Sequence, residues 1–256
     1  MKRFLMGLAC AYAAAASAGD AAVDKVLECM RGNIPQVLRV QEFEINSVDR
    51  TGGERLLRGR LYAMRESELM RAMVKIKSPP DLNNAAYLIR EGKDRDDMFV
   101  FLPALNRVRR IMGGNADSPL FGTDLSYSDV KQIQNSFSGG VAKLEKPDTV
   151  ENRPVNVVAL TPTPGGDTHY TLIRGWIDQK TCIPLKIEFY DGANVRKRLS
   201  TPAAAVKPYG NAWYTSEARM DDLQAKTHTT LKITGFTKPD KLSERYFNAS
   251  SFYTAE

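Results

Sequence analysis

The chain has 256 residues, of which 36 are Lys or Arg and 30 are Asp or Glu, so its formal net charge is +6. This length is enough for one sizeable core, and the modest positive surplus is compatible with anionic lipid head groups but is common among exported proteins. Three cysteines and two histidines are too few and too dispersed for a structural zinc site, so we expect no metal and no cofactor.

Residues 1–18, MKRFLMGLACAYAAAASA, have the layout of a cleaved secretory signal. Lys2 and Arg3 begin it, an apolar run follows, and the small residues Ala16 and Ala18 stand where signal peptidase needs them. The apolar run is shorter than the roughly 20 residues that span a bilayer. We therefore expect export to the periplasm; a membrane anchor and a lipid-modified Cys10 are the alternatives.

The mature chain, residues 19–256, begins with a predicted helix. Apolar residues recur there at helical spacing, with Gly32 and then Pro35 as stop signals; they are Val23, Val26, Leu27 and Met30. We expect this short amphipathic helix to pack against the remainder of a single domain.

From about Val37 the apolar period changes from 3.6 to 2, which is typical of strands. The first predicted hairpin pairs residues 37–48 with 54–64 across DRTGG, whose glycines can take positive φ. Further strands are predicted at 69–77, 85–92, 97–103, 107–112, 139–146, 154–162, 168–178, 182–191, 194–200, 212–220 and 225–236. About eleven to thirteen strands are too many for one flat sheet, so we predict a mainly β fold with short α-helices, in which an antiparallel sheet curls into an open or closed barrel.

One helix is predicted inside the run of strands, in SYSDVKQIQN. Ser126 is positioned as its N-cap, and Asp129 follows three residues later in a variant of the capping box. Tyr127, Val130 and Ile133 share one predicted face. A short helix between two strands of a curled sheet can cover the mouth of that sheet.

The strand DMFVFL departs from the alternation elsewhere because both of its faces are apolar. Phe99 and Phe101 point one way, and Met98, Val100 and Leu102 the other. Two explanations stay open: a central strand covered on both sides, or a strand with one face on a ligand cavity.

The segment after this strand combines cations with an apolar loop. Arg107, Arg109 and Arg110 are candidates for contacting an anionic head group at a cavity rim, or for pairing at the surface with Asp96, Asp97 or Asp124. Leu120 and Phe121 stand in a loop between Pro119 and Gly122. Such a loop is either buried or held ready to touch a partner.

The sequence lacks the short motifs of common catalytic centres, including the Gly-x-Ser-x-Gly elbow, the phosphate-binding loop, the dinucleotide fingerprint and His-Glu-x-x-His. His169 and His228 stand in threonine-rich segments and are interpreted as sheet-face residues. We therefore predict that the chain is not an enzyme. The export signal argues against nucleic acid as a partner of the arginines.

Two cysteines, Cys29 and Cys182, remain after removal of the signal. An even pair in an oxidising compartment can close a disulfide. We predict that this bond ties the N-terminal helix to the sheet.

The order of an aromatic strand, LPALNRVRRI, a glycine-containing loop and FGTDLSYSDV strongly resembles the LolA-like outer-membrane lipoprotein-sorting proteins, in the branch associated with RND-type lipid exporters. The ending LSERYFNASSF is similar to that family too. The resemblance implies an unclosed, curled antiparallel β-barrel, a LolA/LolB-like half-barrel, whose helices cover an apolar cavity. The matching candidates for cavity wall and lid are Phe99, Phe101, Leu102, Leu120, Phe121 and Tyr127, with Arg107, Arg109 and Arg110 at the rim.

The function implied is that of a periplasmic carrier that binds lipid or lipoprotein acyl chains and shuttles them between the inner and outer membranes. The implied partners are an inner-membrane exporter of the RND or ABC type, an outer-membrane acceptor and, transiently, the membrane itself. The alternative is a non-carrier binding or scaffold subunit of a cell-envelope complex, which would use the Leu120–Phe121 loop as its contact.

Overall fold

The computed structural model describes residues 13–93, 96–134, 137–237 and 244–254. Residues 1–12 of the predicted signal lie outside this range. Helix α1 (Ala13–Gly32) begins inside the predicted signal, earlier than the sequence pattern indicates. Its predicted apolar residues do face the molecule, since Val23 and Met30 are buried and Val26 and Leu27 pack beside them.

Most of the described chain forms one 14-stranded antiparallel sheet with the order β6-β5-β4-β3-β2-β1-β16-β15-β12-β11-β10-β9-β7, and β8 paired to β9. The strands of its first half are β1 (Arg39–Val48), β2 (Glu54–Glu66), β3 (Leu69–Ser78), β4 (Ala86–Arg90), β5 (Asp97–Leu102) and β6 (Arg107–Ile111). Those of its second half are β7 (Gly140–Leu144), β8 (Asp148–Val150), β9 (Arg153–Pro162), β10 (Leu172–Asp178), β11 (Pro184–Asp191), β12 (Asn194–Ser200), β15 (Glu217–Asp222) and β16 (Thr227–Thr237).

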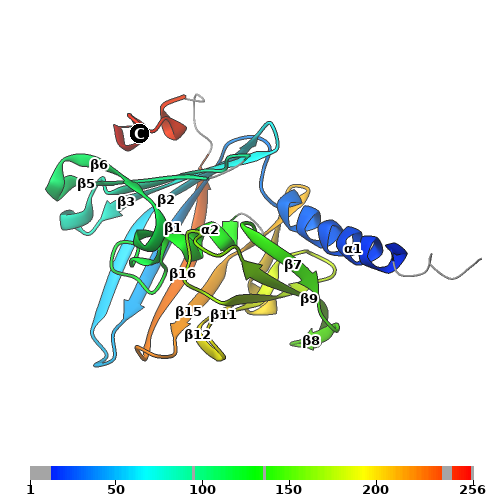
Figure 1. The fold of residues 1–256 in the computed structure, drawn as a ribbon. Coiled ribbons are helices and arrows are strands. Elements are labelled where there is room, and N and C mark those ends of the chain that lie inside the picture. Colours follow the sequence, from blue (N-terminus) through cyan, green and yellow to red (C-terminus); the bar gives the residue numbers. More distant parts are fainter. Residues whose placement is uncertain (1–12, 94–95, 135–136, 238–243, 255–256) are drawn as a thin grey trace, which may run out of the picture.

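The sheet is curled and unclosed, as predicted for the fold class. Strand β16 pairs with β1 from Val48 opposite His228 to Val40 opposite Thr237, with one shift of register between Glu42 and Phe43, and so joins the two halves of the chain. The edge strands β6 and β7 are each paired on one side only among the described residues. Figure 1 shows α2 (Tyr127–Gln134) between the two halves of the curled sheet and α1 beside β7.

The sequence pattern missed part of the second half. The predicted strand 212–220 is two strands, because β14 (Ala212–Thr215) pairs with β13 (Val206–Tyr209) as a separate hairpin while β15 joins the main sheet. Strands β8 and β13 were not predicted. The 168–178 segment becomes a strand only from Leu172, so His169 lies in a loop, where its Nδ1 is 2.7 Å from Asp117 Oδ2, and the sheet-face interpretation of this histidine is wrong.

Each face of the first half of the sheet is covered by a different part of the chain. The inner face carries α2 and the loop before it, and its core includes Phe43, Leu57 and Tyr87. The outer face is covered by the C-terminal segment (Figure 1). There Tyr246 stacks on Tyr62, with ring centroids 4.7 Å apart. The remaining short 3₁₀ helices are η1 (Pro80–Leu82), η2 (Pro103–Leu105), η3 (Gly113–Asp117), η4 (Ala203–Ala205), η5 (Glu244–Phe247) and η6 (Phe252–Thr254).

Candidate functional site

A mostly apolar cavity of about 220 Å³ lies between the inner face of the sheet, the two helices and the β13–β14 hairpin. The sheet supplies side chains that alternate inward along β2, β12, β15 and β16, because successive strand residues point to opposite faces. These wall residues include Leu61, Leu199, Met220, Leu231 and Ile233. The cover includes Met30 and Ile34 from the α1 end and Leu125, Val130 and Ile133 from α2 and its preceding loop.

The start of α2 is fixed by the predicted capping box. The Ser126 N–H donates to Asp129 Oδ2 at 2.8 Å, and the Asp129 N–H donates back to Ser126 Oγ at 3.1 Å. Ser128 Oγ donates to Asp117 Oδ1 at 2.8 Å. Two otherwise unpaired backbone donors of the first turn are satisfied in this way, so the helix begins where the sequence indicates.

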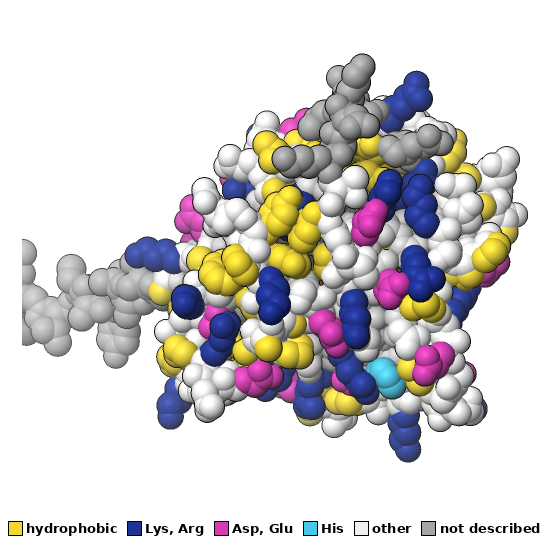
Figure 2. Space-filling model, turned by 180° about the vertical axis from the view of Figure 1, so that it is seen from behind, with side chains coloured by type: hydrophobic (Ala, Val, Ile, Leu, Met, Phe, Trp, Pro, Cys, Tyr) yellow, Lys and Arg dark blue, Asp and Glu magenta, His cyan; other side chains and the backbone are white. Residues whose placement is uncertain are grey.

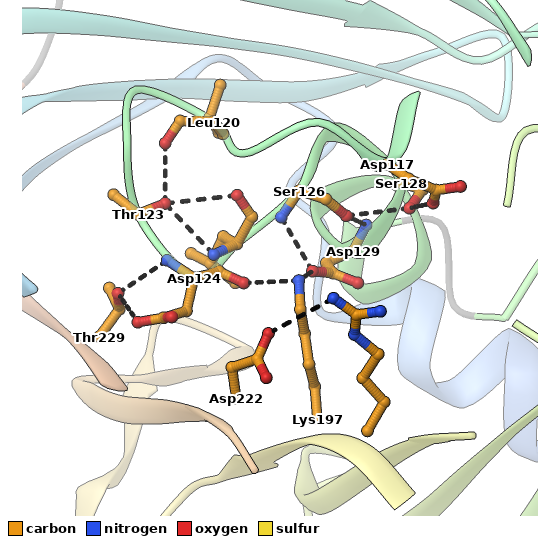
Figure 3. A network of polar contacts seen from close by, with 12 residues as sticks. Asp117, Leu120, Thr123, Asp124, Ser126, Ser128, Asp129, Lys197, Asp222 and Thr229 are labelled. Atoms are coloured by element: carbon orange, nitrogen blue, oxygen red, sulfur yellow. Dashed lines mark hydrogen bonds and ion pairs between the residues drawn. The ribbon is translucent and has the colours of Figure 1, made fainter. Parts of the chain in front are cut away.

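Asp129 also holds α2 onto the sheet (Figure 3). Its side chain is fully buried, and Lys197 Nζ on β12 donates to its Oδ2 at 2.8 Å. The Tyr170 hydroxyl donates to the other carboxylate oxygen at 2.9 Å, and both burial and Asp129 raise the pKa of that tyrosine far above its ordinary value. A buried ion pair whose partners are also hydrogen-bonded is strongly coupled, since removing one partner leaves an uncompensated charge.

The loop before α2 is held by a second set of polar contacts. Asp124 accepts hydrogen bonds from the hydroxyls of Thr227 and Thr229 on β16, and its N–H donates to Thr229 Oγ1 at 2.9 Å. Its backbone oxygen accepts from Lys197 Nζ at 2.7 Å. Polar contacts therefore attach the loop before α2 to both β12 and β16 on the inner face of the sheet (Figure 3).

Two buried phenylalanines anchor the chain before and after α2. Phe121 precedes the helix with φ 53° and Phe137 follows it with φ 62°, and their side chains are 7% and 3% exposed. A left-handed conformation is uncommon for such bulky residues and persists only where the surroundings impose it. Their burial supplies that constraint.

The other side of α2 faces a polar hollow of about 650 Å³ between the ends of β6 and β9. Lys131 Nζ lies there, 3.2 Å from Asp96 Oδ2 and 2.9 Å from Asp167 Oδ2. Burial lowers the pKa of Lys131, but the two carboxylates outweigh it and the net pKa is raised. Thus α2 presents apolar residues to one cavity and charged residues to the other.

A disulfide joins Cys29 on α1 to Cys182, with 5.8 Å between the Cα atoms. Cys182 lies between β10 and β11 and itself lines the apolar cavity. The bond therefore attaches the end of α1 to the sheet beside the cavity, at the position that the sequence predicts.

Arg39 at the start of β1 is the one charged side chain among the described residues that line the apolar cavity. Its Nε and Nη1 atoms are buried and form no hydrogen bond, and its Cζ lies 5.6 Å from the ring centroid of Tyr209. Burial lowers the pKa of Arg39, with Tyr209 and Tyr214 acting in the opposite sense. Each buried donor without a partner costs about 1–3 kcal/mol, so burial of this side chain is costly.

None of the six predicted wall and lid residues is among those that line the apolar cavity. Phe99 and Phe101 lie on the outer face, where Phe101 stacks on Tyr253 with centroids 4.1 Å apart. Their partner is the C-terminal segment, so β5 is a strand covered on both sides. Leu102, Leu120, Phe121 and Tyr127 do gather on the inner face, in the core beside the cavity.

The three predicted rim arginines lie on β6, at the free edge of the sheet, and are exposed. Arg110 pairs with Asp97, one of the surface partners considered from the sequence. Arg109 lowers the pKa of Tyr127, although burial raises that pKa more. They are not among the cavity-lining residues either.

Sequence reasoning missed Arg39 and the β13–β14 hairpin as parts of the site. One signal was present: Arg39 and Gln41 are in phase with Phe43 and Ile45, so the alternation itself places a cation on the apolar face of β1.

No helix in the described part of the chain is long and apolar enough to cross a membrane. Within that same part, no cluster of three or more His, Cys, Asp or Glu side chains is arranged to hold a metal ion.

Comparison with solved structures identifies the fold. A domain named for outer membrane lipoprotein sorting, from Vibrio parahaemolyticus, superposes with a TM-score of 0.78 at 22% identity, covering 91% of this chain and 97% of its own. A DUF1329 family protein from Desulfovibrio piger gives 0.80 at 20% identity, covering 90% and 97%. A LolA superfamily protein from Nitrosomonas europaea gives 0.67 at 18% identity, covering 88% and 96%. The half-barrel is thus LolA-like.

No curated protein matches the sequence. A family model described as "-like: Uncharacterized protein" matches residues 68–254, which is well over half of the chain and includes α2 and its contacts on β12 and β16. The chain therefore belongs to that family, and it has the LolA-like fold.

Proposed function

We propose that this protein is a periplasmic carrier that binds the acyl chains of a lipid or lipoprotein in its apolar cavity and moves them between the inner and outer membranes. The observation that carries the proposal is the cavity itself, with its aliphatic wall on the sheet and a cover of two helices. One solved structure with the same fold is named for lipoprotein sorting, which supports the proposal. The role is binding and release rather than catalysis.

The energetics suit such a role. Each buried methylene contributes about 0.8 kcal/mol, so a chain is captured with few directional contacts. The cavity volume of about 220 Å³ is below the roughly 300–1,000 Å³ of small-molecule sites, so only part of a long chain fits in this arrangement. A full chain requires outward movement of the cover. We propose that an inner-membrane exporter of the RND or ABC type loads the carrier and that an outer-membrane acceptor unloads it.

The scaffold alternative depended on the Leu120–Phe121 loop being available as a surface contact. Leu120 and Phe121 are 5% and 7% exposed and pack into the inner core, so they do not form an apolar contact loop at the surface. The Leu120 N–H also donates to the Leu125 carbonyl at 2.7 Å, which closes the loop on itself.

Binding is tested by mass spectrometry of organic extracts from protein expressed in the periplasm and by titration with the neutral fluorescent probe N-phenyl-1-naphthylamine. Ala218 lines the cavity, so Ala218→Phe should lower probe affinity by roughly tenfold by occupying the site. Ala204 is exposed, so Ala204→Phe is the matched control and should bind as the wild type does. Protein that carries no lipid and binds no probe would refute the proposal.

Transfer needs a separate assay. Vesicles with a fluorescent fatty acid serve as donors and unlabelled vesicles as acceptors, and the protein should raise the transfer rate in proportion to its concentration. Binding without acceleration of transfer would limit the role to lipid storage or sensing.

A further inference from the structure

The apolar cavity contains one positive charge and no negative one among its described lining residues. Arg39 supplies the charge, and two of its guanidinium N–H groups, on Nε and Nη1, are buried without a hydrogen-bond acceptor. An arginine remains protonated at any physiological pH. These buried, charged donors therefore lack an acceptor, and an anionic oxygen is the acceptor that suits them best.

Gln41 adds further hydrogen-bond donors to the same wall of the cavity. It lies two residues further along β1, on the same face, and is 5% exposed. Both side chains line the cavity, and the Gln41 amide makes no hydrogen bond to any described residue. Arg39 and Gln41 thus place hydrogen-bond donors on one wall of a mostly apolar space.

Aromatic rings surround this end of the cavity. Tyr209 stacks on Phe236 with centroids 4.2 Å apart, and Tyr214 meets the same ring edge-on at 4.9 Å. Tyr209 is 38% exposed, so the arginine end of the cavity lies near the surface. The rings hold the guanidinium in place through the 5.6 Å contact with Tyr209, but they offer no charge to neutralise it.

We propose that Arg39, assisted by Gln41, binds the anionic oxygen head group of an acyl ligand, a carboxylate or a phosphate, while the chain lies along Leu61, Leu231 and Ile233. This inference rests on the proposed function and specifies its ligand class. Hydrogen bonds from a guanidinium to the charged oxygen of a carboxylate or phosphate are roughly twice as strong as those between neutral groups. Neutral lipids offer the same donors only uncharged acceptors and bind less tightly.

The test compares three ligands with the same twelve-carbon chain: dodecanoate, dodecyl phosphate and the uncharged 1-dodecanol. Each displaces N-phenyl-1-naphthylamine from the wild type, Arg39→Met and Arg107→Met at about pH 8, where carboxylates are ionised. Arg107 is exposed on β6 and away from the cavity lining, so it is the matched control for loss of one positive charge. Thermal melting confirms that each variant is folded.

We expect the wild type to bind at least one anion roughly tenfold or more tightly than dodecanol. Arg39→Met should abolish this preference while leaving dodecanol affinity within about twofold, and Arg107→Met should preserve it. A preference for dodecanoate alone assigns the site to free fatty acids, and one that includes dodecyl phosphate assigns it to phospholipid head groups.

Two results would overturn the inference while leaving the carrier function intact: equal affinity of the wild type for all three ligands, or an anion preference that survives in Arg39→Met. A merely structural arginine would give the first of these together with a lowered melting temperature in Arg39→Met. If the wild type binds neither the probe nor any of the three ligands, the proposed function fails and the head-group site fails with it.

Discussion

The Asp129 carboxylate links α2 to two other parts of the molecule. Its carboxylate is fully buried and accepts hydrogen bonds from the Lys197 ammonium, the Tyr170 hydroxyl and the Ser126 backbone. One residue thus caps α2, fixes the helix to β12 and satisfies a tyrosine of the β9–β10 loop. The position of α2 on the sheet therefore depends on this carboxylate.

The first prediction concerns Asp129→Asn. The substitution leaves the buried Lys197 charge without its counterion, so we expect a loss of about 3–5 kcal/mol in the free energy of unfolding, measured by urea titration. Asp221→Asn breaks the exposed pair with Arg219 and is the control, with a change below about 1 kcal/mol.

A double-mutant cycle separates the ion pair from the other contacts of Asp129. Asp129→Asn combined with Lys197→Met should cost clearly less than the sum of the two single changes, because the unpaired charge is absent from the double variant. Additive effects would show that the pair itself contributes little.

At the scale of elements, the end of α2 depends on a glycine in the sheet. Gly175 on β10 has no side chain, and a Cβ built there would lie 2.3 Å from Cζ of Phe137. The absence of that methyl group is what leaves room for the buried ring that follows α2.

The second prediction is that Gly175→Ala displaces Phe137 and costs about 1–3 kcal/mol of stability in urea unfolding, with higher affinity or faster binding of the fluorescent probe as the cover loosens. Gly114→Ala is the control, since a Cβ there meets nothing within 4 Å. Unchanged stability in Gly175→Ala would mean that Phe137 does not anchor the helix.

The free edge strand β6 gives the arginines of the sequence motif a different role from the one first expected. Arg107, Arg109 and Arg110 are exposed on a strand that pairs only with β5 among the described residues. Charged side chains on an unpaired edge discourage pairing with another sheet. We therefore expect the motif to discourage association of the half-barrel through this edge.

The third prediction is that the double variant Arg107→Thr/Arg109→Thr shows concentration-dependent dimers or larger species in light scattering, because like-charge repulsion between edges is reduced. Lys93→Thr/Lys180→Thr removes the same charge from exposed residues outside the strands and should leave the mass unchanged. Identical masses for both variants at all concentrations would contradict this role.

At the scale of the molecule, the disulfide joins positions 153 residues apart and so closes most of the chain into one loop. In the chain-entropy model a loop longer than 100 residues contributes about 4–5 kcal/mol by restricting the unfolded state.

The fourth prediction is that Cys29→Ala/Cys182→Ala lowers the free energy of unfolding by about 3–5 kcal/mol relative to the oxidised wild type. Reduction of the wild type should reproduce most of this loss, whereas reductant should leave the double variant unaffected. Two free thiols in the oxidised protein, detected by mass spectrometry after alkylation, would refute the bond.

Local patterns predicted the elements well because their physics is local. Alternation placed β1, β2 and β12 almost to the residue, and the Ser126–Asp129 spacing located the start of α2. Strand β8 was missed because three residues, Asp148–Val150, are too few to show a period. The hairpin β13–β14 was missed because its register depends on a partner rather than on a pattern.

The site was predicted less well because it depends on which distant segment covers which face. The sequence led us to place Phe99 and Phe101 in the cavity wall. In the structure they are covered by the C-terminal segment, whose Tyr253 lies about 150 residues further along the chain. No local sequence pattern indicates that the C-terminal segment packs against β5. The family resemblance gave the fold and the covering helix correctly, yet it did not identify the cavity-lining side chains of this chain.

The two helices over the cavity are attached by different kinds of bond, so the two sides of the cover differ in how easily they can move. Helix α1 is fastened covalently through Cys29, whereas α2 is held by hydrogen bonds and the Asp129–Lys197 pair, which can break and re-form. If the chain acts as the carrier proposed above, we therefore expect α2 rather than α1 to move when the cavity opens in the oxidised protein. Reduction of the Cys29–Cys182 bond would remove the covalent restraint on α1.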